Sequence, residues 1–210
     1  KAELPSTWRF ASMNPHKVTR DFEDSLAAYT NSAYAVAVDS CSNAIFLSLK
    51  WIGIEGIEIT IPKHTYMSVP CQIIHAGGKV SFIDSQRLLK GGYKLEPTPV
   101  WDSALSFTRD MYIPGQLMCL SFSGPSKILK LGKGGAILTD DREAYEWFQR
   151  ARYHGRNPID HRLDNFDMLG WNMYMTPEIA ARGLVLMAGM DENPDVTQEY
   201  QDLSQFDIYK

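Results

Sequence analysis

Apolar residues recur at helical spacing near the start of the chain. Val18, Phe22, Leu26 and Tyr29 fall on one face of a segment over residues 17–29, and charged residues fill the opposite face. A spacing of three to four residues between apolar positions is typical of an amphipathic helix that packs on a core through one side. The pattern therefore predicts a surface helix as the first element.

Strands and helices then alternate along the chain. Short apolar runs predict strands over residues 33–38, 57–61, 79–83, 117–122 and 136–139. Capping residues and amphipathic segments predict helices over residues 44–51, 66–76, 141–153 and 176–190. Such alternation favours a three-layer α/β fold, in which a mostly parallel sheet is covered by helices on both faces. We expect residues 1–190 to form one domain and the polar, loop-like residues 191–210 to form a tail.

The composition narrows the class of protein. The 210 residues are 44% hydrophobic and 22% charged, with a net charge of −4, so the chain can bury a core and lacks the basic patch that nucleic acids require. No uncharged apolar run approaches the roughly 18 residues of a membrane span. Cys41, Cys71 and Cys119 are scattered, without metal-ligand spacing. We expect a cytoplasmic protein with no metal, nucleic acid or membrane partner.

Polar residues follow the predicted strands, which is where open α/β sheets bind ligands. These segments, which supply hydroxyls, carboxylates, an aromatic ring and a lysine, are residues 39–43, 62–66, 84, 101–104 and 121–127. The hydroxyls of Ser40, Ser42 and Ser121, with free N–H groups at the start of the following helix, suit a phosphate. We therefore expect a phosphate-bearing ligand at this edge of the sheet.

The glycine-rich stretch over residues 131–135 does not fit a nucleotide-binding loop. In a P-loop, a glycine would stand at the position of Lys127, and a Ser or Thr would follow Lys133. This chain has Gly134 after Lys133. The third glycine of a dinucleotide fingerprint would fall on Ile137, and the stretch leads into a strand. A tight turn before that strand is the simpler interpretation.

The motifs, taken in order, resemble the DegT/DnrJ/EryC1/StrS family of sugar aminotransferases that depend on pyridoxal 5′-phosphate. They comprise residues 39–44, 61–66, 80–84, 101–104, 120–122, 127–141, 152–155 and 169–172, of which 127–141 is the most diagnostic. The similarity runs from about Val18 to Met190. It implies the large domain of the fold type I transferases, with the small C-terminal domain largely absent and the segment between Asp84 and Asp102 shortened.

The resemblance also implies roles for individual residues. Lys127 matches the family lysine that forms a Schiff base with the cofactor, and Asp102 matches the aspartate under the pyridine nitrogen, so both are expected to be catalytic. The other expected cofactor-binding residues are Cys41, Ser42, Tyr66, Ala104, Ser121 and Asn172. Tyr66 would stack on the ring, and Ser42 and Ser121 would bind the phosphate. Asn172 would serve the neighbouring subunit of a homodimer with a shared site.

The activity implied is transfer of an amino group from an amino acid such as glutamate to a nucleotide-linked keto-sugar. Two alternatives remain open. The chain could be a non-catalytic relic that keeps the cofactor for a structural or regulatory role. Leu105 stands where the family usually has Gln or His, and much of the surface that would bind the sugar is missing. It could also be a sugar dehydratase using the same cofactor. Members that dehydrate at C-3 typically carry His in place of the lysine, so Lys127 favours transamination. Aromatics of the tail, from Tyr200 to Tyr209, suit docking across the dimer interface.

Overall fold

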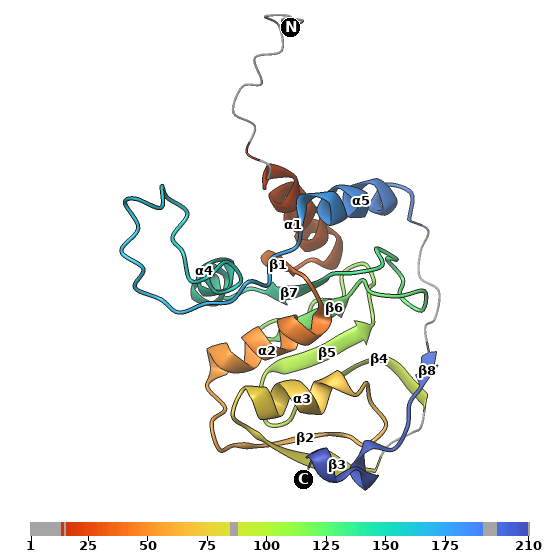
Figure 1. Ribbon diagram of the computed structural model, residues 1–210. Helices are drawn as coiled ribbons and strands as arrows, with labels where there is room; N and C mark the ends of the chain where they lie inside the picture. The colour runs from red at the N-terminus through yellow and green to blue at the C-terminus, as the bar shows by residue number, and fades with distance from the viewer. Residues whose placement is uncertain (1–13, 15, 85–87, 191–196, 210) are drawn as a thin grey trace, which may run out of the picture.

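A six-stranded mixed sheet forms the centre of the molecule (Figure 1). The computed structural model describes residues 14, 16–84, 88–190 and 197–209. In spatial order the strands are β1 (Tyr34–Val38), β7 (Gly135–Thr139), β6 (Leu117–Ser121), β5 (Val100–Leu105), β4 (Leu88–Lys94) and β8 (Thr197–Glu199). The strands β2 (Glu58–Pro62) and β3 (Lys79–Ile83) form a separate parallel pair. An isolated bridge between Thr60 and Glu96 joins β2 to the segment between β4 and β5.

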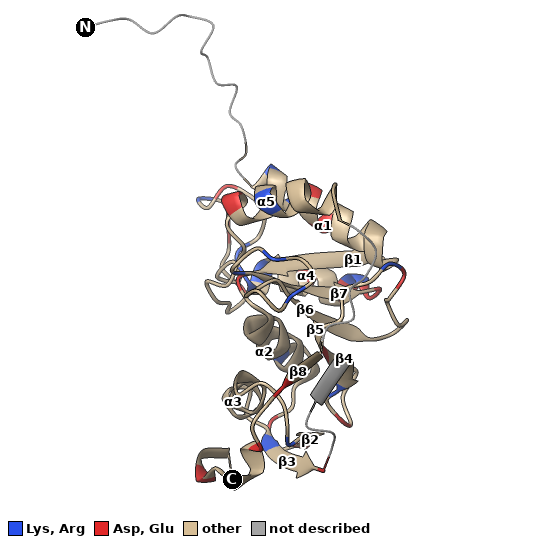
Figure 2. Cartoon of the chain, turned by 90° about the vertical axis from the view of Figure 1, so that its right-hand side faces the viewer, with Lys and Arg blue, Asp and Glu red and all other residues tan. Residues whose placement is uncertain are grey.

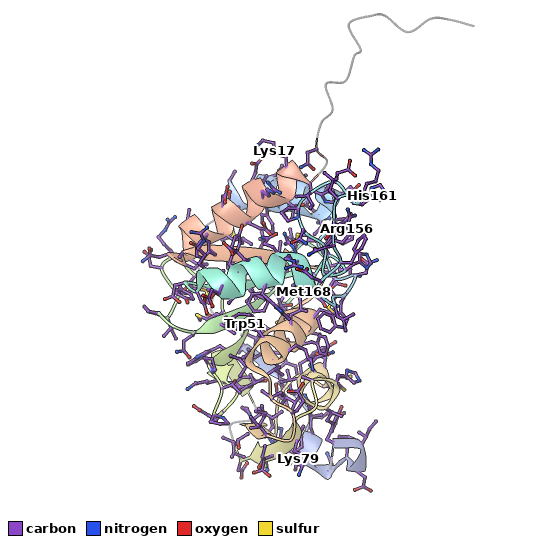
Figure 3. The ribbon with its side chains drawn as sticks, turned by 90° about the vertical axis from the view of Figure 1, so that its left-hand side faces the viewer. Lys17, Trp51, Lys79, Arg156, His161 and Met168 are labelled. Carbon is purple, nitrogen blue, oxygen red and sulfur yellow. The ribbon has the colours of Figure 1, made fainter. Side chains whose placement is uncertain are left out.

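Helices cover both faces of the sheet, which confirms the expected three-layer α/β arrangement. The helices α1 (Lys17–Thr30) and α5 (Pro177–Met187) pack on one face, and α2 (Cys41–Ile52), α3 (Ser68–His75) and α4 (Arg142–Ala151) lie on the other. Strand β1 shows how the two cores are separated. Val36 and Val38 face the α2 side, whereas Ala35 and Ala37 face α1, because successive side chains of a strand point in opposite directions. Figure 3 shows the α4 side, with Trp51 of α2 and Met168 of a following loop labelled.

The strand pairing is mixed, whereas the sequence predicted a mostly parallel sheet. Among the described strand pairs, β5/β6 and β2/β3 are parallel, and β1/β7, β6/β7, β4/β5 and β4/β8 are antiparallel. A parallel connection needs a crossover of a dozen or more residues, usually a helix. The segment between β3 and β5 contains β4 and leaves too few residues on either side of it for a helix. Strand β4 therefore returns as the antiparallel neighbour of β5.

The predicted helices are all present, with small shifts at their ends. Helix α2 begins at Cys41, earlier than expected, because the Ser40 hydroxyl accepts a hydrogen bond from the Asn43 N–H at 3.2 Å. Asp141 caps α4 in the same way. The tail was expected to be loop-like, but its described part adds β8 and two short 3₁₀ helices, η2 (Leu203–Gln205) and η3 (Asp207–Tyr209). Strands β4 and β5 were not predicted either, and residues 101–104, which were expected to follow a strand, lie within β5.

Charged groups are dispersed over the surface. Lysine and arginine are interspersed with aspartate and glutamate on the side shown in Figure 2. Within the described ranges, no helix has both the length and the apolar content needed to cross a membrane.

A buried ion pair ties the two helical layers together. Glu23 of α1 and Arg152, which follows α4, form an ion pair and are both buried. The same Glu23 carboxylate accepts a hydrogen bond from the Ala37 N–H at 2.8 Å and one from Gln149 at 3.2 Å, so it joins α1, β1 and α4. Breaking such a pair leaves a charge without compensation in the interior.

We predict that Glu23→Gln lowers the free energy of unfolding by about 3 kcal/mol, because Arg152 stays buried without its counter-charge. Urea titration followed by circular dichroism measures the change. The matched control is Glu146→Gln, which removes an exposed pair with Arg142 and should cost less than about 1 kcal/mol. Equal losses for the two variants would contradict the structural role assigned to Glu23.

Candidate active site

Lys127 is buried at the carboxyl end of the sheet. It lies in the stretch between β6 and β7, which folds back on itself through hydrogen bonds from the Leu131 N–H to the Phe122 carbonyl and from the Phe122 N–H to the Gly134 carbonyl, both 3.0 Å long. Only 9% of Lys127 is exposed. Burial lowers the pKa of its amine, an effect that the nearby Cys41 and Asp102 oppose. A larger fraction of the amine is therefore neutral than in an exposed lysine.

Asp102 lies on β5 and is also buried. Its carboxylate accepts hydrogen bonds from the Ala104 N–H and from the Tyr93 hydroxyl, each at 3.0 Å. The Tyr93 hydroxyl also shares a hydrogen bond of 2.5 Å with Thr65. Burial raises the pKa of Asp102, while these donors and the charge of Lys127 act in the opposite direction. The structure thus brings Lys127, Asp102 and Ala104 together, as expected.

Cys41 marks where the start of α2 meets the sheet. Its thiol donates to the Cys119 carbonyl at 3.4 Å, and burial raises its pKa well above the usual value. A side chain at Gly135 would come within 2.5 Å of the Cys41 nitrogen, so glycine is required for this close approach. Ser121 is the register partner of Gly135. The expected residues Cys41 and Ser121 therefore lie at the same edge as Asp102 and Lys127.

Ser42 and Tyr66 lie beside this group. The Ser42 hydroxyl is hydrogen-bonded to that of Ser68 at 2.7 Å, so the starts of α2 and α3 meet there. Tyr66 is half-exposed, and its ring lies 6.2 Å from that of Tyr200 in an edge-to-face arrangement. Tyr200 in turn borders a small cavity with Asp102.

Asn172 lies on a segment that runs beside the start of α2, since the carbonyl of its neighbour Met173 accepts a hydrogen bond from the Asp39 N–H at 2.9 Å. It is exposed on the segment between α4 and α5 and bridges to Tyr153. Among the contacts of the described residues, none joins it to Lys127 or Asp102.

Sequence reasoning missed Thr65, Tyr93 and Tyr200 as members of this group. Tyr93 lies in the shortened segment before Asp102, where no strand was predicted. Tyr200 belongs to the tail, whose aromatics indicated docking but not the surface that they dock on. The tail docks on its own chain, near β2, β3 and α3.

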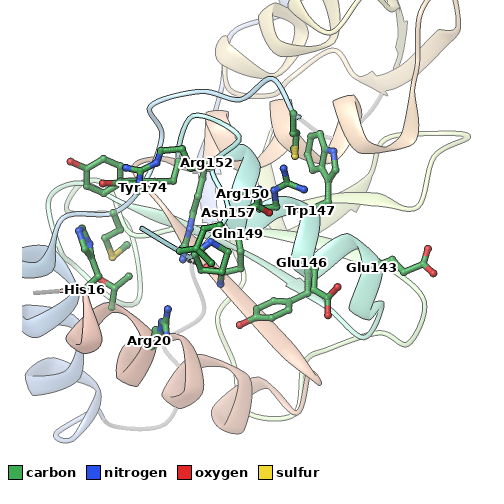
Figure 4. Close-up of a pocket in the computed structure, with 18 of the residues that line it drawn as sticks. His16, Arg20, Glu143, Glu146, Trp147, Gln149, Arg150, Arg152, Asn157 and Tyr174 are labelled. Carbon is green, nitrogen blue, oxygen red and sulfur yellow. Dashed lines mark hydrogen bonds between the residues drawn. The ribbon is translucent and has the colours of Figure 1, made fainter. Parts of the chain in front are cut away.

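A larger cavity of about 960 Å³ lies elsewhere, between α1, α4 and the loop that follows α4 (Figure 4). Its lining includes Arg20, Arg150, Trp147 and Tyr174, and none of the eight expected site residues. Arg150 is already paired with Asp167. Among the described residues, no group of three His, Cys, Asp or Glu side chains is placed to hold a metal ion.

We predict that Lys127→Met raises the urea midpoint of unfolding at pH 7. A lysine whose pKa is lowered by folding binds fewer protons in the folded than in the unfolded state, so it destabilises the fold below the folded pKa. The gain should shrink as the pH rises towards 10.5, the ordinary value for lysine, where both states lose the proton. The exposed Lys130→Met is the control, and an identical pH profile for both variants would argue against a desolvated Lys127.

Comparisons with known proteins bear on this arrangement. The model of the DegT/DnrJ/EryC1/StrS aminotransferase family matches residues 9–89 and 114–205. The spore coat polysaccharide biosynthesis protein SpsC of Bacillus subtilis is 41% identical over 213 residues, which cover 82% of this chain and 52% of SpsC. The GDP-perosamine synthase of Escherichia coli O157:H7 is 24% identical over 250 residues, covering 99% of this chain and 65% of that protein. The chain thus spans about half to two thirds of the length of these relatives.

The solved structures agree on the fold. AtS13 from Actinomadura melliaura superposes with a TM-score of 0.74 at 19% identity, over 83% of this chain and 60% of AtS13. DesV of S. venezuelae, solved in complex with a ketimine intermediate, gives a TM-score of 0.70 at 21% identity, over 83% and 57% of the two chains. The family model matches most of the length of this chain, which therefore belongs to the DegT/DnrJ/EryC1/StrS aminotransferase family, as its motifs had indicated.

Proposed function

We propose that this chain is the cofactor-binding part of an aminotransferase that uses pyridoxal 5′-phosphate, with residues 1–190 as the cofactor domain and 191–210 as a tail. The observation that carries the proposal is the buried Lys127 amine, placed near the Asp102 carboxylate and the start of α2. A primary amine with a lowered pKa is what nucleophilic lysine chemistry requires. Burial disfavours the charged form of this amine, so the folded chain carries a cost for placing it there.

The residues fit the cofactor chemically. Pyridoxal phosphate supplies an aldehyde that takes up amines and a ring that accepts electrons. Asp102 would hold a proton at the ring nitrogen, and its fixed hydrogen bonds from Ala104 and Tyr93 orient it for that task. Ser42, Ser121 and the N–H groups at the start of α2 would bind the phosphate, because a helix N-terminus favours anions. Tyr66 would cover one face of the ring.

Lys127 would also move protons. With the cofactor and an amino donor bound, the Lys127 amine would accept a proton from the donor carbon and later give it up again, as general acid–base catalysis requires. Burial favours this role, since it lowers the pKa of the amine and so raises the fraction of the amine that is neutral. The burial of Lys127 also keeps water away from the amine, which would limit hydrolysis of a bond formed there.

We propose an amino acid such as glutamate as donor and a keto-sugar linked to a nucleotide as acceptor, and the GDP- and UDP-linked sugars in the names of the relatives support the second part. The relatives include a GDP-perosamine synthase and a UDP-4-amino-4,6-dideoxy-N-acetyl-beta-L-altrosamine transaminase of Campylobacter jejuni, the latter 25% identical over 228 residues. A sugar substrate is accordingly our proposal for this chain. The three cysteines are free, which suits a reducing cytoplasm.

We further propose a homodimer with shared sites. The loop between α4 and α5 projects from the body (Figure 1) and carries four exposed apolar side chains, Ile159, Leu163, Phe166 and Leu169. Exposed apolar groups gathered on one segment are typical of an interaction surface. A second copy covering this loop would bring Asn172 near the site of its neighbour.

Cofactor attachment tests the proposed function. Purified protein is incubated with pyridoxal phosphate, reduced with borohydride and digested, and the modified peptide is identified by mass spectrometry. We expect the modification on Lys127, its loss in Lys127→Ala, and its retention in the exposed-site control Lys130→Ala. Glutamate added before reduction should abolish the modification as the amino group moves to the cofactor. Attachment that glutamate does not affect would favour the relic, and attachment elsewhere would contradict the assignment.

Subunit mixing tests the shared site. We expect Lys127→Ala and Asn172→Ala each to bind pyridoxal phosphate poorly, and an equimolar mixture that exchanges subunits at random to regain about a quarter of the sites of the wild type, because half of the dimers are mixed. In a mixed dimer, one site combines the intact Lys127 of one subunit with the intact Asn172 of the other. Equilibrium dialysis measures the sites, and sedimentation confirms the dimer. No recovery on mixing, in a sample shown to exchange subunits, would mean that Asn172 acts in its own site or in none.

A further inference from the structure

The described end of the chain lies across the candidate active site. We call residues Thr197–Tyr209 the strap. It begins as β8, which pairs with β4 in antiparallel register, and continues past the ends of β2 and β3 to η3 (Figures 1 and 2). In Figure 1 it is the blue segment that descends from β8 to the C-terminus beside β3. The strap therefore covers elements that carry Thr65, Tyr66 and Tyr93.

Beyond the β8–β4 pairing, contacts at Leu203, Asp202 and Tyr209 help to anchor the strap. The Leu203 N–H donates to the Lys63 carbonyl at 2.8 Å, and the Leu203 side chain is buried. The Lys63 ammonium lies 3.2 Å from the Asp202 carboxylate. Further along, the Tyr209 hydroxyl donates to the Met67 carbonyl at 3.3 Å. One buried apolar side chain and a few partly exposed polar contacts make a segment that can open without unfolding the core.

The Tyr200 ring borders the site. The His64 Nδ1 donates to the Tyr200 carbonyl at 3.1 Å, which fixes the backbone there. The ring meets Tyr66 edge to face and borders a cavity of about 10 Å³ together with Thr65, Tyr93 and Asp102. Burial and the Asp102 carboxylate both raise the pKa of the Tyr200 hydroxyl, which places that ring within the electrostatic reach of the carboxylate.

The cavity that Tyr200 borders beside Asp102 is too small for the ring of the proposed cofactor. A cavity of about 10 Å³ holds about one water molecule, whereas sites for small molecules and cofactors measure roughly 300–1,000 Å³. On the other side of the site, the Ser126 hydroxyl, next to Lys127, donates to the Gln198 side chain at 3.3 Å. The strap thus reaches both sides of the space between Asp102 and Lys127.

We propose that the strap is an autoinhibitory element, in which Tyr200 occupies the position that the cofactor ring needs beside Asp102 and Tyr66. This inference rests on the proposed function, because it takes pyridoxal phosphate as the ligand. The strap must leave before the ligand enters, so the apparent affinity is the intrinsic affinity multiplied by the fraction of molecules in which the strap is open. The cofactor and the docked strap exclude one another.

The test compares pyridoxal phosphate binding by three full-length proteins: wild type, Tyr200→Ala and Phe206→Ala. Phe206 belongs to the strap but is 40% exposed and does not border the cavity, so its replacement is the matched control. Removing the Tyr200 ring should tighten binding about tenfold, because the lost aromatic and apolar contacts favour the open state. Phe206→Ala should bind as the wild type does.

A second measurement does not depend on any variant. Hydrogen exchange of the wild type should become faster at the Leu203 amide when pyridoxal phosphate is added, because the bond to the Lys63 carbonyl breaks as the strap leaves. Unchanged or weaker binding by Tyr200→Ala, or unchanged exchange at Leu203 with cofactor bound, would overturn the strap proposal and leave the proposed function standing. Failure of all three proteins to attach the cofactor at Lys127 would overturn both.

Discussion

The shortness of the connection between β3 and β5 is the constraint on which much of this structure depends. Because β4 cannot be followed by a crossover helix, it pairs with β5 as an antiparallel neighbour and sets Tyr93 opposite Asp102. That register explains why the Tyr93 hydroxyl reaches the Asp102 carboxylate. It also leaves β2 and β3 as a separate pair and gives β4 a second edge, which β8 covers. An uncovered edge would offer free backbone groups to other chains, so the pairing of β8 satisfies a need that the short connection creates.

The electrostatics of the site disfavour the charged forms of both Asp102 and Lys127. Burial raises the pKa of Asp102 and lowers that of Lys127, so each group is pushed towards its neutral form, and their mutual attraction only partly compensates. Apolar side chains of the same size would pack there at lower cost. Sites that work against stability in this way are where function is expected, since selection for stability alone would remove them. This contrasts with the Glu23–Arg152 pair, whose hydrogen bonds to β1 and α4 give it a structural purpose.

Local sequence signals account for the layers and for most of the site. Alternating apolar runs and caps such as Ser40 and Asp141 predicted the order of strands and helices, because those signals act within a few residues. The same reasoning placed Asp102 and Lys127 at one edge. The pairing of β4 was out of reach, since its partner is chosen by the length of the connection and by tertiary packing. Gly135 was interpreted as part of a turn, whereas its role is the close approach of β7 to the start of α2, which involves residues far apart in sequence.

The strap and the proposed dimer contact lie on different parts of the molecule and need not compete. The loop between α4 and α5 projects on the α4 side, while the strap runs along β4, β2 and β3 (Figure 1). None of the described strap residues lines the large cavity beside that loop. A second copy could therefore bind the loop while the strap stays closed, and the strap could open without breaking the dimer. Under the two proposals, one surface would complete the site from outside the chain and the other would control entry from within it. A chain that spans about half to two thirds of its relatives would then retain both the reactive pair and a means of keeping it covered.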